Sequence, residues 1–220
     1  MEIIQVKQPI VHIAMIDSDS LRFVGLRVLL SSESDLDLQS VSMAEIIERQ
    51  EVDLVLLGNR SGRNVLEVLT TMKALCPGLD VIVMGCNLDD AAILKAVSAG
   101  AKGYLDETAS VGELVQAIRI VLAGSVWVPR RVLTMFVEQV YRSPAQGVSP
   151  GQRPFTSRER EVLKMLVAGC SNREIASPLG ITERTVKSYI AKLMRKVGVV
   201  NRVRLSVHAI THSLVLSRQS

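Results

Sequence analysis

Short apolar runs alternate with segments of helical spacing through the first 128 residues. The run at 10–16 is rich in β-branched residues, and residues 20–31 then carry apolar side chains at helical intervals. The same pair recurs four more times, with apolar runs at 36–42, 53–57, 80–85 and 102–105. Strands that alternate with helices in this way predict an α/β fold, a five-stranded parallel sheet covered by helices on both faces.

The last part of the chain carries a different pattern. Four helical segments are separated by stop signals, at 156–169, 171–180, 182–198 and 201–216. Thr156, Ser171 and Thr182 are suited to cap the first three. A short helix, a turn with glycine and a longer basic helix follow one another in the order of a helix-turn-helix. We therefore predict an all-α, four-helix region here.

The third of these helices has two faces. Val186, Ile190, Leu193 and Val197 form one apolar stripe suited to a core. Cationic, small and polar side chains fall on the other side, namely Arg184, Lys187, Ser188, Ala191 and Arg195. Such a face can lie in the major groove of DNA, so we expect it to be exposed. The competing interpretation is a basic helix that is merely solvated.

The charge distribution favours the first interpretation. Residues 1–152 carry 13 Lys and Arg against 18 Asp and Glu, a net charge of −5. Residues 153–220 carry 13 against 4, a net charge of +9. This asymmetry indicates an acidic module joined to one that meets a polyanion. The 3 cysteines are widely spaced, and neither a signal peptide nor a long apolar run is evident, so we expect a cytoplasmic protein with no membrane contact.

A boundary region separates the two parts. Residues 130–142 have apolar positions at helical spacing and predict a connecting helix. Residues 143–154 are rich in proline and glycine, which is typical of a flexible tether. We therefore divide the chain into residues 1–128, a linker at 129–154 and residues 155–220.

The C-terminal sequence resembles the LuxR-type helix-turn-helix that ends NarL/FixJ response regulators. The match runs through FTSREREVLKMLVAGCSNREIA and LGITERTVKSYIAKLMRKVGVVNR. It implies DNA contacts at Lys187, Ser188 and the position of Ala191, which is often lysine in relatives. It also places Thr185 near the phosphate backbone. With their neighbours on this helix, the expected DNA-binding residues are Thr182, Arg184, Thr185, Lys187, Ser188, Ala191, Lys192 and Arg195.

Residues 10–128 resemble the receiver domain of the same regulators, through AGAKGYLDE and SVGELVQAIRIVLAGSVWVP. The resemblance implies a flavodoxin-like, doubly wound sheet whose strand ends hold the phosphorylation site. Tyr104 matches the aromatic switch position of the family. It also implies a dimer, with the face at 89–124 as the candidate surface, although most of its apolar residues are expected to pack on the sheet.

The residues at the receiver pocket depart from the family pattern. Gly58 stands at the phosphoacceptor position, Ser18 at the second acid, Gly85 at the Thr or Ser, and Glu107 at the lysine; only Asp17 matches. Asp53 begins the same strand as Gly58, roughly 16 Å away, and cannot substitute. Phosphoryl transfer depends on an acceptor and charge neutralisation, so we predict a pseudo-receiver with no catalytic residue, metal or cofactor.

These patterns predict a transcriptional regulator that binds promoter DNA as a homodimer without aspartyl phosphorylation. RNA polymerase is a further expected partner. Three alternatives stay open: an interaction protein that titrates a related regulator, a regulator whose receiver pocket binds a small ligand, and a small α/β enzyme. An enzyme is disfavoured because no phosphate-binding glycine loop follows the first strand. We therefore expect no enzymatic activity.

Overall fold

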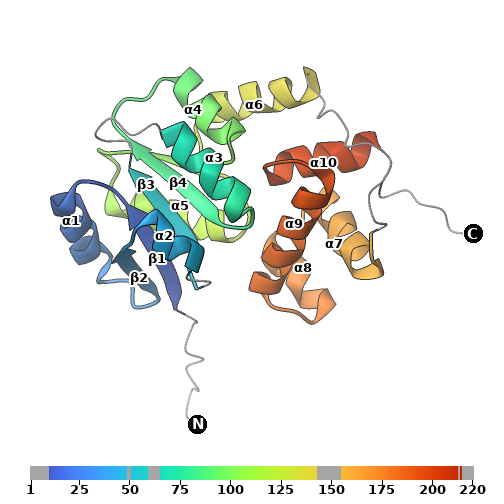
Figure 1. The fold of residues 1–220 in the computed structure, drawn as a ribbon, viewed down its shortest axis with the longest axis horizontal. Helices are drawn as coiled ribbons and strands as arrows, with labels where there is room; N and C mark the ends of the chain where they lie inside the picture. The colour runs from blue at the N-terminus through green and yellow to red at the C-terminus, as the bar shows by residue number, and fades with distance from the viewer. Residues whose placement is uncertain (1–9, 49–50, 59–64, 143–154, 213, 215–220) are drawn as a thin grey trace, which may run out of the picture.

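The computed structural model describes residues 10–48, 51–58, 65–142, 155–212 and 214. Its N-terminal part is a parallel sheet of five strands, in the order β2-β1-β3-β4-β5 (Figure 1). The strands are β1 (Val11–Ile16), β2 (Leu36–Ser40), β3 (Leu54–Gly58), β4 (Asp80–Gly85) and β5 (Gly103–Asp106). The parallel sheet agrees with the alternating pattern, and its order is the flavodoxin-like, doubly wound one that the receiver resemblance implied. The register pairs Leu54 with Asp80, so the two central strands begin side by side.

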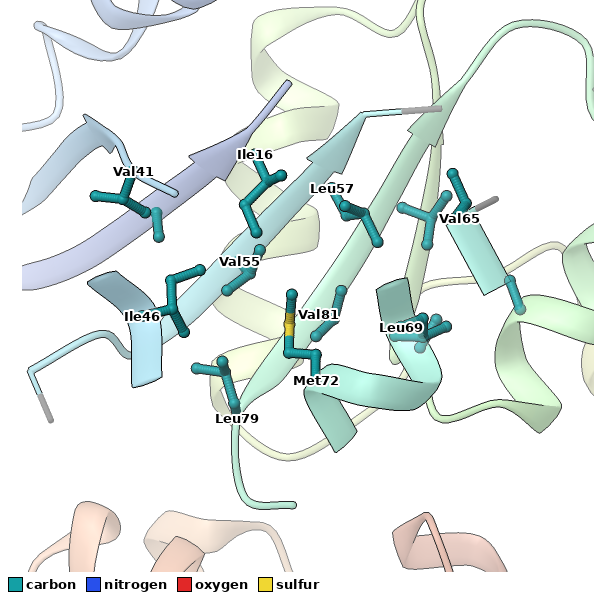
Figure 2. Close-up of a cluster of buried hydrophobic side chains, with 14 residues drawn as sticks. Ile16, Val41, Ile46, Val55, Leu57, Val65, Leu69, Met72, Leu79 and Val81 are labelled. Atoms are coloured by element: carbon teal, nitrogen blue, oxygen red, sulfur yellow. The ribbon is translucent and has the colours of Figure 1, made fainter. Parts of the chain in front are cut away.

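Five helices connect and cover the strands. They are α1 (Ser20–Leu30), α2 (Met43–Glu48), α3 (Val65–Leu75), α4 (Asp90–Ser98) and α5 (Val111–Leu122). Successive residues of a strand point to opposite faces, so each central strand serves two cores. Val55 and Leu57 pack with α2 and α3, as Figure 2 shows, while Leu54 and Leu56 pack with α1 and α5.

The C-terminal part is the predicted set of four helices. They are α7 (Ser157–Val167), α8 (Asn172–Leu179), α9 (Glu183–Val197) and α10 (Arg202–Thr211). Their shared core includes Leu163, Ile175, Val186 and Leu193. Pro178 does not end α8 but lies in its last turn, and Gly180 closes the helix in the left-handed region at φ 62°.

Helix α6 (Arg130–Arg142) lies between the two parts, with the bounds expected of the connecting helix. Val132, Phe136 and Val140 pack against Ile93 and Val97 of α4, and α10 adds partly buried contacts (Figure 1). The tether expected at 143–154 lies outside the described residues, as does most of the loop after β3.

The face at 89–124 that we considered for dimer formation is largely occupied. Leu114, Ala117, Ile118 and Val121 are buried in the sheet core, and Val97 lies under α6. This agrees with the expectation that most of these residues pack helices onto the sheet. Within the described residues, no helix is long and apolar enough to cross a membrane.

Candidate DNA-binding interface

Helix α9 has the geometry of the predicted recognition helix. The Thr182 side chain accepts a hydrogen bond from the Thr185 amide at 3.1 Å and starts the helix, and Gly198 ends it at φ 73°. Val186, Ile190, Leu193 and Val197 are buried. The predicted apolar stripe therefore sits in the four-helix core and fixes which side of α9 faces outward.

The expected DNA-binding residues fall into two groups. Thr182, Arg184, Ser188, Lys192 and Arg195 are exposed, and Thr185 is half-buried. Lys187 and Ala191 instead lie under the N-terminal part of the molecule. The Lys187 side chain is only 17% exposed, and Ala191 is buried. The expectation that the whole face would be open was therefore wrong for the arrangement seen here.

An ion pair explains why Lys187 is covered. Its Nζ lies 2.7 Å from Oδ2 of Asp80, the first residue of β4 and fully buried. The other carboxylate oxygen of Asp80 pairs with Nζ of Lys102 at 2.5 Å. Burial alone would raise the pKa of Asp80, but Lys102 and Lys187 outweigh it and hold that pKa below its ordinary value. The two lysines thus keep a buried carboxylate ionised.

Two further contacts bring α9 against the same edge of the sheet. Arg184 places a guanidinium nitrogen 3.2 Å from Asp53, immediately before β3. Gly78 approaches Ala191 so closely that a Cβ built on Gly78 would lie 3.0 Å from the Ala191 Cβ. The N-terminal part therefore meets the recognition helix with two acids and one glycine. Sequence analysis missed Asp80, and it considered Asp53 only as a substitute phosphoacceptor.

A third lysine lies beneath this contact. Lys73 is buried, and its Nζ donates to the carbonyl of Leu79. Burial, with Lys102 nearby, lowers the pKa of Lys73 to about 8. The contact between the two parts is therefore a cluster of three lysines around one buried carboxylate.

The start of α8 forms a second point of attachment. The Asn172 amide donates to the carbonyl of Ala123 at 3.1 Å, and its side-chain amide donates to Leu122 at 3.3 Å. Arg202 donates in turn to Oδ1 of Asn172 at 3.0 Å. The four-helix region is thus attached both at the amino edge of the sheet and at the end of α5.

The receiver pocket lies at the opposite, carboxyl edge of the sheet. Asp17 occupies the space beside Gly58, because a Cβ built on Gly58 would lie 2.1 Å from Oδ2 of Asp17. Arg22 pairs with Asp17 at 3.0 Å and also with Glu107. An internal guanidinium therefore compensates both acids. Ser18 is exposed at the edge of this pocket and Gly85 is buried at the end of β4.

Tyr104 borders the same pocket. Its hydroxyl lies 3.2 Å from the carbonyl of Gly85 and 3.1 Å from Asp106, and it accepts from the Leu88 amide at 3.3 Å. Burial is the main cause that raises the pKa of Tyr104. Hydrogen bonds from Thr108 and Asn87 hold the pKa of Asp106 far below its usual range. No group of three potential metal ligands occurs among the described residues.

Comparisons with known proteins assign the C-terminal region. Residues 153–209 match the family model described as bacterial regulatory proteins, luxR family. The transcriptional regulatory protein MctR of Rhizobium johnstonii is 27% identical over 95% of this chain and 97% of its own. The response regulator VraR of Staphylococcus aureus is 26% identical over 93% and 99%. Residues 153–209 therefore form a LuxR-type DNA-binding domain, in a chain that is similar to response regulators over nearly its whole length.

Solved structures add a similarity of fold. A LuxR-family two-component response regulator from Aurantimonas sp. SI85-9A1 superposes with a TM-score of 0.51, at 21% identity, over 60% of this chain and 99% of its own. The response regulator ChrA of a heme-sensing two-component system is 28% identical over 93% and 98%, with a TM-score of 0.47. The family-model match and the similarity to MctR and VraR confirm the resemblance to LuxR-type response regulators, and the degenerate receiver stays a prediction.

The ion pairs of Asp80 and Arg22 could not be predicted from the sequence. Asp80 looked like an ordinary acid at a strand start, yet it contacts residues 22 and 107 positions further along the chain. Arg22 follows the first strand at helical spacing and gave no sign that its guanidinium would reach Glu107. Both residues form long-range ion pairs, which hydrophobic periodicity does not encode.

Proposed function

We propose that this response regulator controls transcription by inserting α9 into the major groove of promoter DNA. The proposed contacts are Thr182, Arg184, Thr185, Lys187, Ser188, Ala191, Lys192 and Arg195. The LuxR-type domain supports DNA binding, and the net charge of +9 in residues 153–220 supports a polyanionic partner. From the family resemblance we further propose that the regulator is cytoplasmic, has no enzymatic activity and contacts RNA polymerase.

The arrangement described here is proposed to be the form that does not bind DNA. Lys187 pairs with Asp80 at 2.7 Å and is covered by the N-terminal part, so its ammonium group cannot reach a phosphate or a base in this arrangement. Ala191 lies against Gly78, which leaves no room for a groove edge. DNA binding therefore requires the four-helix region to separate from the amino edge of the sheet. We call the arrangement with the two parts in contact the closed form. The apparent affinity for DNA is proportional to the fraction of molecules in which the two parts have separated.

Control is proposed to be independent of aspartyl phosphorylation. The single observation that carries this is the filled space at Gly58, where Asp17 and its partner Arg22 stand in place of an acceptor. Glycine offers no oxygen to a phosphoryl donor, and Arg22 already compensates the charge that a divalent cation would meet. The family chemistry therefore lacks both its acceptor and a site for its cation.

We expect no phosphorylated species with acetyl phosphate and Mg²⁺, and we expect the Gly58→Asp variant to stay unmodified as well. The new side chain would collide with Asp17, so Gly58→Asp should lose about 1–3 kcal/mol of unfolding free energy through overpacking. Gly112→Asp on the surface of α5 is the matched control and should keep its stability. Intact mass measures phosphorylation, and thermal unfolding measures stability. A gain of one phosphoryl group in the wild type or in the Gly58→Asp variant contradicts the proposal.

The dimer is proposed to form through α1. Leu21, Val24 and Val28 lie on one side of this helix and are 82%, 53% and 65% exposed. A second copy of the chain is the occupant that fits, because two identical apolar helix faces match one another in an isologous dimer. Such a pair would also present two recognition helices to a palindromic operator.

The Val24→Glu variant is therefore expected to be monomeric. A buried, unpaired carboxylate at the centre of the α1 contact is costly, so the mass in solution should fall from twice 24.0 kDa to 24.0 kDa. Light scattering coupled to size exclusion measures it. Ile210→Glu, at another exposed apolar side chain, is the control and should not change the mass. A Val24→Glu variant that remains dimeric rules out this face.

A further inference from the structure

A cavity of about 530 Å³ lies between the N-terminal part and the four-helix region, beside the contact that covers Lys187 and away from the receiver pocket. Its walls come from α4 and the segment after α5 on one side, from α6, and from α7 and α10 on the other. Val97, Val126, Phe136, Leu166 and Val207 supply apolar surface. This volume lies in the range of sites for small molecules, and the lining is mostly apolar, as in such sites.

The charged residues that line the cavity all have one sign. Lys102 and Arg202 contribute to its walls, and no Asp or Glu does within the described residues. Lys102 already pairs with Asp80. Among the described residues, Arg202 donates hydrogen bonds to two neutral oxygen atoms, Oδ1 of Asn172 and the carbonyl of Cys170. Asp80 acts on Arg202 only through space, with no direct ion pair described, and a half-buried guanidinium without a bonded carboxylate favours an anionic group in the cavity.

A buried amide donor at the cavity wall points the same way. Asn201 is only 9% exposed, and its Oδ1 accepts from the Arg204 amide at 2.9 Å to cap α10. Its Nδ2 atom has no hydrogen-bond partner within the described part of the chain. An unpaired buried donor costs about 1–3 kcal/mol, and an acceptor oxygen on a ligand would remove that cost.

We propose that this cavity binds a small apolar molecule with a single anionic group, a carboxylate or an equivalent, close to Arg202 and Asn201. Because both parts of the molecule supply its walls, the cavity exists only while they are in contact. A ligand there stabilises the closed form and, by linkage, opposes DNA binding to the same extent. Binding of the ligand to the cavity does not depend on the proposed function. Only the effect of the ligand on DNA binding rests on that function.

The binding step is tested with 1-anilinonaphthalene-8-sulfonate, an apolar anion that fluoresces in apolar surroundings. Its uncharged analogue N-phenyl-1-naphthylamine is the comparison. We expect the full-length protein to bind the sulfonate at one site. Ser206 of α10 lines the cavity, so Ser206→Phe should obstruct it and weaken binding at least tenfold. Ser206→Ala is the matched control and should bind within twofold of the wild type. Equal affinity of the Ser206→Phe and wild-type proteins overturns the proposal.

The anionic preference is tested at Arg202. The Arg202→Met variant should lose most of its affinity for the sulfonate but keep its affinity for the uncharged dye, which also shows that the cavity is intact. Loss of neither dye overturns the assignment of Arg202. If both dyes are lost, Arg202→Met has separated the two parts of the molecule. Arg202→Gln, whose amide can still donate a hydrogen bond, then takes its place, and undiminished sulfonate affinity in that variant overturns the preference.

The coupling to DNA is measured separately. A saturating sulfonate concentration should raise the Kd for promoter DNA severalfold in the wild type and leave Ser206→Phe unchanged. An unchanged Kd in the wild type overturns the coupling. If no variant binds DNA while the dye still distinguishes Ser206→Phe from Ser206→Ala, the proposed function fails and the ligand site stands.

Discussion

Replacing Gly78 with leucine is expected to raise the affinity for promoter DNA about tenfold. Gly78 faces Ala191 of α9 at the limit of close packing, so any larger side chain forces the recognition helix away from the sheet edge. No hydrogen bond or charge is lost within either part. The gain arises because the DNA-competent form becomes the main population, and the apparent Kd scales inversely with that fraction.

Fluorescence anisotropy with a labelled promoter fragment at fixed salt measures this gain. Gly112→Leu changes a glycine on exposed α5 surface and should bind DNA like the wild type. Equal affinity of Gly78→Leu and wild type means that the contact does not regulate DNA binding. If the open variant binds no DNA at all but pairs with a related regulator, the titrating interaction protein becomes the better interpretation.

Lys187→Ala is expected to lower DNA affinity by about five- to a hundredfold, but only when measured in the Gly78→Leu background. In the wild type the substitution has two opposed effects, because Lys187 serves both Asp80 and the proposed DNA contact. In the Gly78→Leu background, α9 has already moved away from Asp80, so the substitution affects only the DNA contact. Loss of one phosphate or base contact costs about 1–3 kcal/mol, and a phosphate contact also reduces the slope of log affinity against log salt by about one.

The salt titration separates this contact from a loss of folding. Glu161→Ala is a suitable control, since Glu161 is exposed on α7 and its one ion pair within the described ranges is with Arg158 on its own helix, at 2.8 Å. It should leave the slope unchanged. A Lys187→Ala variant that keeps both the affinity and the slope of its Gly78→Leu parent would falsify the assignment of Lys187 to the interface.

The hydrophobic pattern was enough to predict the elements and their order. Runs such as 80–85 became central strands because apolar residues on both faces require helices on both sides, and the capping residues Thr156, Ser171 and Thr182 start the helices expected of them. These are local signals or signals with a fixed period. The same reasoning placed Val186 and Leu193 in the helical core.

What the sequence did not predict is how the two parts meet. Whether α9 faces solvent or the sheet depends on Asp80 and Asp53, which lie more than a hundred positions away from their partners Lys187 and Arg184. A buried carboxylate of this kind has no periodic signature, and its ionisation depends on cations that only the folded chain assembles. The closed arrangement is therefore a tertiary property, invisible to pattern and charge counts alone.

The ion pairs of Arg22 have a consequence for timing. Under the proposed phosphorylation-independent control, a regulator that carries its own cation at the strand ends would not wait for a phosphate donor, and no phosphatase would return it to rest. Its response would follow the amount of protein made or the level of a bound metabolite, and would fade by dilution or release. Such a molecule reports a sustained condition of the cell rather than a brief stimulus.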